Sequence, residues 1–205
     1  MTLLLALGLA ASTAETAPTS YPATEMLGAF KELCADSSST DAVRASARAT
    51  GWVEFTPPAA SNLGKLFITG KSMVADMAAK GAKVELTPFF AFHKVVAGRN
   101  IEASADAATT AAAGKTITVT GCQVYDFSAP GMLDDATLTT WVGHAPDKKV
   151  EYPGQLTAIS WDNGLAGPGS QLKLAFAPST STFADPNRLM VLGLVIKSQH
   201  YTITP

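Results

Sequence analysis

The chain has 205 residues, of which 47% are hydrophobic and 16% charged, and its 15 Lys and Arg against 17 Asp and Glu give a net charge of −2. This composition excludes an intrinsically disordered chain, which would be poorer in apolar residues and richer in net charge. The near-neutral charge also argues against a nucleic-acid partner, because such a protein needs a basic face to displace counterions. The length fits one domain, which we expect at residues 23–205.

The first residues follow the pattern of a secretory signal. Leu3 to Ala11 form a short apolar run, and the small residues Ser12 and Ala14 follow it. We therefore predict a signal peptide at residues 1–14 and a flexible Pro/Ser/Thr-rich leader at residues 15–22. No Lys or Arg precedes the apolar run, so a buried N-terminal segment or strand stays open as the alternative. No stretch is long enough for a transmembrane helix, and we expect no membrane span and a periplasmic or secreted location.

The predicted location decides how the two cysteines, Cys34 and Cys122, are interpreted. In an oxidising compartment the simplest interpretation is one disulfide between them, and two buried free thiols are the alternative. The chain has no C-x-x-C motif, so neither a redox motif nor a thiolate zinc site is indicated. Gly121 interrupts the alternation of its strand, and we expect a β-bulge there that turns Cys122 toward Cys34.

The N-terminal half favours helices. We expect a helix capped by Thr24 whose apolar residues recur at helical spacing, so that Cys34 faces the interior. A second, Ala-rich helix is expected from Asp41 to about Thr50, and a third, short one from Ser72 to Lys80. The run from Phe89 to Val96 is typical of a strand.

Residues 102–115 are an Ala/Thr/Ser-rich segment of low complexity, which could form a helix and could equally be a loop. Beyond them, Asp134 and Asp135 begin a helix that ends at Gly143. Alternating or continuous apolar runs predict strands at Thr116 to Phe127, Gln155 to Trp161, Gln171 to Ala177 and, as a central strand, Leu189 to Ile196. The fold class is therefore α+β, with two or three N-terminal helices packed on a mainly antiparallel sheet and one disulfide.

Motifs for nucleotide binding and acyl transfer fail on their spacing or their local structure. The Gly-Lys-Ser and Gly-Lys-Thr tripeptides at Gly70 and Gly114 lack the glycine that a phosphate-binding loop needs five residues earlier, where Lys65 and Thr109 stand. Ser170 and Lys173 match S-x-x-K, but a strand places them on opposite faces, whereas that chemistry needs one helix face. We predict no cofactor.

Three histidines remain as candidate catalytic or metal-binding groups: His93, His144 and His200. No two of them have the i, i+2 or i, i+4 spacing of a ligand pair, and we predict no metal site. His93, which lies in an aromatic strand, is the least implausible general base, although a core or strand-face histidine is the more ordinary interpretation.

Trp52, Trp141 and Trp161 are candidate binding residues, because exposed aromatic side chains could line a face for a sugar or peptide. A place in the core is the default alternative, since Trp52 and Trp141 fall on apolar faces. The Gly-rich segment from Gly164 to Ser170 could face a ligand or simply connect two strands.

Three segments, Phe90 to Arg99 (FAFHKVVAGR), Gly121 to Phe127 (GCQVYDF) and Trp141 to Gly143 (WVG), resemble a group of small secreted proteins of proteobacteria whose function is uncharacterised. The resemblance covers part of the mature chain, and its motifs are structural in character. It implies a disulfide-linked α+β domain in a Gram-negative periplasm. It brings no catalytic residues to this chain.

These observations lead to two functional hypotheses. The first is a non-catalytic secreted or periplasmic protein that associates with the envelope or binds a ligand, and its partner is an envelope protein or a small molecule. The second is a small periplasmic hydrolase with an active site around His93. A cleft that holds His93 close to a serine and a carboxylate would favour the hydrolase, and isolated histidines would favour the binding protein.

Overall fold

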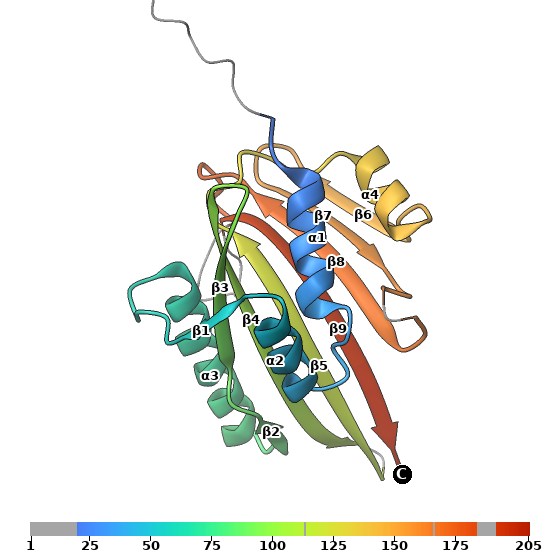
Figure 1. The fold of residues 1–205 in the computed structure, drawn as a ribbon. Helices are drawn as coiled ribbons and strands as arrows, with labels where there is room; N and C mark the ends of the chain where they lie inside the picture. The colour runs from blue at the N-terminus through green and yellow to red at the C-terminus, as the bar shows by residue number, and fades with distance from the viewer. Residues whose placement is uncertain (1–19, 113, 166, 184–191) are drawn as a thin grey trace, which may run out of the picture.

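The computed structural model describes residues 20–112, 114–165, 167–183 and 192–205, and it has an α+β fold (Figure 1). Within these residues there are four helices: α1 (Ala23–Cys34), α2 (Thr40–Ala49), α3 (Asn62–Ala79) and α4 (Asp135–Val142). The helices are not confined to the N-terminal part of the chain: α1, α2 and α3 lie before residue 80, and α4 is the helix predicted after Asp134. The predicted signal peptide at residues 1–14 lies outside the described residues.

The nine strands of the described chain form one antiparallel sheet in the order β1-β3-β4-β5-β9-β8-β7-β6, with β2 paired to β4. This sheet is larger than the sequence indicated. The strands are β1 (Val53–Phe55), β2 (Val84–Leu86), β3 (Phe90–Val96), β4 (Arg99–Ala112), β5 (Lys115–Asp126), β6 (Lys148–Tyr152), β7 (Leu156–Trp161), β8 (Ser170–Ala177) and β9 (Gly193–Thr204).

The helices divide between the two faces of the sheet. The main core lies on the face covered by α1, α2 and α4, where the side chains of Phe30, Leu33 and Trp161 are fully buried. On the opposite face α3 packs over the sheet through a smaller cluster that includes Leu63, Leu66 and Tyr125 (Figure 1). The sheet is therefore covered on both faces, but α3 reaches only part of the second one.

A side chain caps the N-terminal end of each described helix except α1. Ser39 caps α2 by accepting a hydrogen bond from Ala42 N–H, and Asp134 caps α4 by accepting one from Thr137 N–H. The prediction that Thr24 caps α1 is wrong, because α1 begins one residue earlier and Pro22 stands at its N-cap without a side-chain bond. Proline is tolerated at this end, where the first N–H groups have no helical partner.

Helix α3 begins ten residues earlier than the predicted start at Ser72. Ser61 caps it by accepting a hydrogen bond from Gly64 N–H, and Leu63 and Leu66 anchor its first turns in the smaller core. Gly64 does not interrupt the helix. It lets the backbone of Pro58 approach so closely that a Cβ at position 64 would collide with the Pro58 carbonyl.

Residues 102–112 of the low-complexity segment form neither a helix nor a loop. They are the larger part of strand β4, which pairs with β3 and β5. Alanine is under-represented in strands, so the position of this segment inside the sheet decides its conformation. Ala103 and Ala105 are fully buried in the core beneath the N-terminal helices, where their small side chains leave room for close packing.

The predicted bulge at Gly121 is absent. The register between β4 and β5 runs without interruption from Glu102 opposite Tyr125 to Ala112 opposite Lys115, and Gly121 stands opposite Asp106. Simple alternation along β5 already places Cys122 in the main core.

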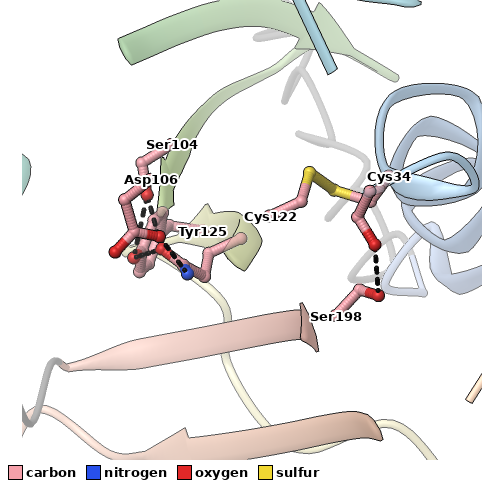
Figure 2. Close-up of a disulfide and its surroundings, with 8 residues drawn as sticks. Cys34, Ser104, Asp106, Cys122, Tyr125 and Ser198 are labelled. Carbon is pink, nitrogen blue, oxygen red and sulfur yellow. Dashed lines mark hydrogen bonds between the residues drawn. A yellow bond between two sulfur atoms is a disulfide. The ribbon is translucent and has the colours of Figure 1, made fainter. Parts of the chain in front are cut away.

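The predicted disulfide is confirmed. Cys34 at the end of α1 is bonded to Cys122 on β5, and their Cα atoms are 5.6 Å apart (Figure 2). Beside it, the hydroxyl groups of Ser37 and Ser198 share a hydrogen bond of 3.1 Å, so the turn after α1 also contacts β9. The loop that this disulfide closes spans 88 residues of sequence separation.

The C-terminal strand of the sheet continues further along the chain than predicted. The expected strand from Leu189 to Ile196 is β9, which begins at Gly193 and continues to Thr204 between β5 and β8; residues 189–191 lie outside the described part. His200 therefore lies in an interior strand.

The C-terminal end of the leader expected at residues 15–22 is held in place by a hydrogen bond. Tyr21 donates a hydrogen bond of 3.0 Å from its hydroxyl to Asp126, and Arg99 donates to the same carboxylate at 2.6 Å. Residues 15–19 lie outside the described part of the chain. No helix in the described residues is both long and apolar enough to span a membrane.

Removal of the disulfide should weaken the fold strongly. We expect the double variant Cys34→Ala and Cys122→Ala to lose about 2–5 kcal/mol of unfolding free energy, because the denatured chain gains the freedom of a long loop. Urea denaturation measures this change. In the wild type, intact mass after alkylation without reductant should show no modified thiol, and two modified thiols would contradict the disulfide.

The Asp126 contacts predict an acid-dependent contribution to stability. Burial alone raises the pKa of Asp126, but hydrogen bonds from Arg99, Ser128 and Tyr21 outweigh it and hold that pKa below its ordinary value. The contribution is present above the unfolded-state pKa of about 4 and is lost as the pH falls through the lower folded-state pKa. Asp126→Asn should lose about 2–3 kcal/mol of unfolding free energy at pH 7, since the bonded Arg99 loses its counter-charge.

Urea denaturation of both proteins at pH 7 and pH 3 tests the sign of this effect. The difference between the wild type and Asp126→Asn should shrink at the lower pH, where the wild-type carboxylate begins to be protonated. A difference of equal size at both pH values would show that Asp126 stabilises the fold by packing rather than by its charge.

Candidate functional site

A pocket of about 340 Å³ lies between the C-terminal half of α3 and the sheet. Its floor comes from β4, β5 and β9, and β2 and the segment before β3 close one side. This volume is within the range of small-molecule sites. The pocket exists because α3 contacts the sheet closely only through its first turns, while Gly70 and the residues after it are only partly covered.

The wall that α3 and its neighbours present is apolar. Phe67, Met73 and Met77 line it from the helix, and Leu86 and Phe89 line it from the segment that follows. Met73 and Met77 remain 43% and 40% exposed. Methionine side chains are flexible and polarisable, so this wall can adapt to apolar molecules of different shape.

The floor of the pocket is a connected set of polar side chains. Ser104 donates a hydrogen bond of 2.6 Å to the Gln123 carbonyl oxygen, which also accepts one of 3.1 Å from the Tyr125 hydroxyl. The Gln123 amide in turn donates to Asp106 at 3.2 Å. Figure 2 shows Ser104, Asp106 and Tyr125 on one side of β5 and the disulfide on the other. Burial raises the pKa of Tyr125, so its hydroxyl stays protonated and can donate.

Two opposite charges complete the floor. Burial raises the pKa of Asp106, and the nearby Lys197 and the Gln123 hydrogen bond partly oppose the rise. Burial lowers the pKa of Lys197, which Asp106 raises and Lys173 lowers further. Lys197 forms no ion pair within 4.0 Å with any carboxylate in the described residues. Its ammonium group is therefore available to a bound molecule.

The close approach of two neighbouring side chains, and not a bulge, accounts for the glycine at position 121. A Cβ at position 121 would lie 2.5 Å from Asp106 Oδ1 and 2.5 Å from Gln123 Nε2. The missing side chain thus leaves the space in which these two groups meet above the strand.

A second hollow, of about 540 Å³, lies over β6, β7 and β8. Lys148, Ser160 and Lys173 share one cross-strand row there, and the next residue in that row is Lys197 of the first pocket. Although this hollow is larger, only the strands and adjoining turn residues line it, so no apolar wall faces the sheet. We therefore take the pocket beneath α3 as the candidate site.

His93 lies on the same sheet face but outside this pocket. It is exposed, its ring stands edge-on to Phe55 with centroids 5.2 Å apart, and Glu102 is opposite it on β4. Among the described residues no hydrogen bond joins His93 to a serine or a carboxylate, and the Ser104 hydroxyl is bonded to Gln123. The arrangement does not assemble a nucleophile and a base.

The tryptophans do not form a common face. Trp52 and Trp161 are 4% and 0% exposed in the main core, and Trp141 packs edge-on against Phe30 with centroids 5.9 Å apart. Trp161 donates a hydrogen bond from its indole N–H to the carbonyl of His144. Two of the three candidate binding residues are therefore inaccessible to a ligand, and Trp141 is only partly covered.

The other candidates are separated in the fold. His144 follows α4, whereas His200 lies within β9, where its Nδ1 is buried without a hydrogen-bond partner in the described residues. No group of three or more potential metal ligands occurs in the described part of the chain. The segment from Gly164 to Ser170 connects β7 to β8, and Ser170 bonds its hydroxyl to the Gly167 carbonyl.

Sequence reasoning missed the pocket residues for a physical reason. Ser104 and Asp106 lie in the segment whose composition did not predict a strand. Gln123 is a single polar residue between Cys122 and Val124, and Lys197 comes directly after the apolar run that predicted β9. A signal was present in the polar alternation of Ser104 and Asp106, which period 2 would place on one strand face.

Comparisons with known proteins identify no relative: no protein-family model, no curated protein and no solved structure matches the chain.

The fit between Gly121 and the polar floor can be tested by adding one methyl group. Gly121→Ala should lower the unfolding free energy by about 1–3 kcal/mol, because the new Cβ forces Asp106 and Gln123 out of their positions. The matched control is Gly131→Ala, where a Cβ meets no atom within 4 Å. Thermal and urea denaturation report the change. Equal stability of the two variants would show that the floor has room to rearrange.

Proposed function

We propose that this protein is a non-catalytic, secreted or periplasmic binding protein that holds a small amphipathic molecule in the pocket beneath α3. The observation that carries the proposal is the pairing of an apolar wall on α3 with a polar floor on β4, β5 and β9. A molecule with an apolar part and a polar part would cover Met73 and Met77 and bond to the floor.

Two features support the location. The disulfide between Cys34 and Cys122 forms and persists in oxidising compartments. The predicted signal peptide at residues 1–14 would deliver the chain to such a compartment. An envelope partner remains part of this proposal, since a protein that carries a small molecule needs a donor or an acceptor for it.

The pocket can be tested with the fluorescent probe 8-anilinonaphthalene-1-sulfonate, which emits strongly when it leaves water for an apolar site. We expect saturable fluorescence with wild-type protein and its loss in Ala108→Phe, since Ala108 lines the pocket floor opposite Leu86 of β2. The control is Ala158→Phe, on the same sheet face but in the second hollow and on β7, two strands away from β9.

A folded state must be verified for each variant by near-ultraviolet circular dichroism, because partly unfolded proteins also bind this probe. If Ala108→Phe does not fold, Val74→Trp blocks the same pocket from the helix side. Equal saturable binding by the wild type and by a folded, blocked variant would refute the pocket as the binding site.

A further inference from the structure

We infer that the ligand of this pocket is an amphipathic monoanion, a carboxylate with an extended apolar body, whose carboxylate lies at Lys197 and whose body lies along α3. This inference rests on the proposed function and adds the chemical class and the orientation of the ligand. Three features of the pocket carry it: the position of its apolar end, the free ammonium group, and the balance of charge around that group.

The apolar end of the pocket is the end covered by α3. Leu86 of β2 stands opposite Ala108 of β4, and Met77 and Phe89 line the same pocket. The rings of Phe67 and Phe89 pack there at a tilt of 32°, with their centroids 4.9 Å apart. An alkyl or aryl body that enters this end is removed from water on several sides, and it covers methionines that are otherwise exposed.

The charged end lies across the sheet on β9. Lys197 is separated from β4 by strand β5, and it shares the pocket with Val195, which lies on the same face of β9. Its own burial disfavours the ammonium charge, so an anion bound to it restores a favourable environment. The Gln123 amide lies in the same floor, and the N–H that it does not donate to Asp106 can orient a carboxylate.

The local balance of charge selects one negative charge. Lys197 faces Lys173 directly across the β8–β9 pair, and Asp106 is the acidic residue that lines the pocket. Lys173 lines the second hollow and not the pocket, but its charge acts on Lys197, so around the Lys197 ammonium two cations stand against one carboxylate. One positive charge is left to be balanced. A cationic ligand would be repelled by Lys197 and by the neighbouring Lys173, whereas a dianion would bring to Asp106 a charge that the site does not compensate.

The probes that separate these classes share one alkyl chain. Isothermal titration with decanoate, decanol, decyltrimethylammonium and decyl phosphate keeps the apolar body constant and changes only the head group. For the wild type we expect decanoate to bind about tenfold more tightly than decanol, as one charge-assisted contact warrants. Decyltrimethylammonium should bind more weakly than decanol, and decyl phosphate more weakly than decanoate.

The decisive variant is Lys197→Met, which keeps an apolar stem of similar length and removes the charge. We expect its affinity for decanoate to fall about tenfold, to that of decanol, whose own affinity should not change. Decanol thus reports whether the pocket is still intact. The matched control is Lys148→Met at the far end of the same cross-strand row, where we expect no change for either probe.

The possible outcomes separate the two proposals. If decanol and decanoate bind with equal affinity to the wild type, or if Lys197→Met keeps the preference for decanoate, the pocket binds amphipathic molecules but the assignment of the carboxylate is wrong. If decyl phosphate or decyltrimethylammonium binds best, the ligand belongs to that other charge class. If none of the four probes binds, the inference fails together with the proposed function.

Discussion

The alternation of side chains along β5 sets the positions of the disulfide, the main core and the pocket. This strand lies in the interior of the sheet between β4 and β9, so each of its residues must fit one of two covered faces. Cys122 and Val124 point into the main core, and Gln123 and Tyr125 point toward α3. A shift of one residue in register would exchange these sets, placing the cysteine in the pocket and the glutamine in the core.

The two faces serve different purposes because they are closed to different degrees. On the first face the disulfide ties α1 to β5, and apolar side chains from three helices fill the space above the strands. On the second face α3 is anchored by Leu63 and Leu66 in its first turns, and its later turns leave a pocket. The well-packed face stabilises the sheet. The other face can therefore keep a cavity, whose lining side chains are only partly in contact with other protein atoms.

Burying the charges of Asp106 and Lys197 beneath α3 costs folding free energy, and no close ion pair between them offsets that cost. The burial of Asp106 and Lys197 disfavours the charged form of each group, and the two do not form a close ion pair. The glycine at position 121 adds to this, because it gives up a strand side chain so that the Asp106 and Gln123 side chains can meet. Buried titratable groups with shifted pKa values cluster at functional sites. The proposed function therefore rests on the pocket and not on the exposed His93.

Elements with a strong local signal could be predicted from the residues alone: α1 and α2 with their apolar faces, α4 between its Asp134 cap and Gly143, the α+β class, and the pairing of the only two cysteines. Three features could be seen only in the folded chain: residues 99–112 form a strand, α3 begins at Asn62, and Gly121 accommodates a carboxylate instead of a bulge. Those features depend on neighbours distant in sequence. Alanine becomes a strand residue because β3 and β5 pair with it on both sides, and a glycine has no side chain from which its partner could be inferred.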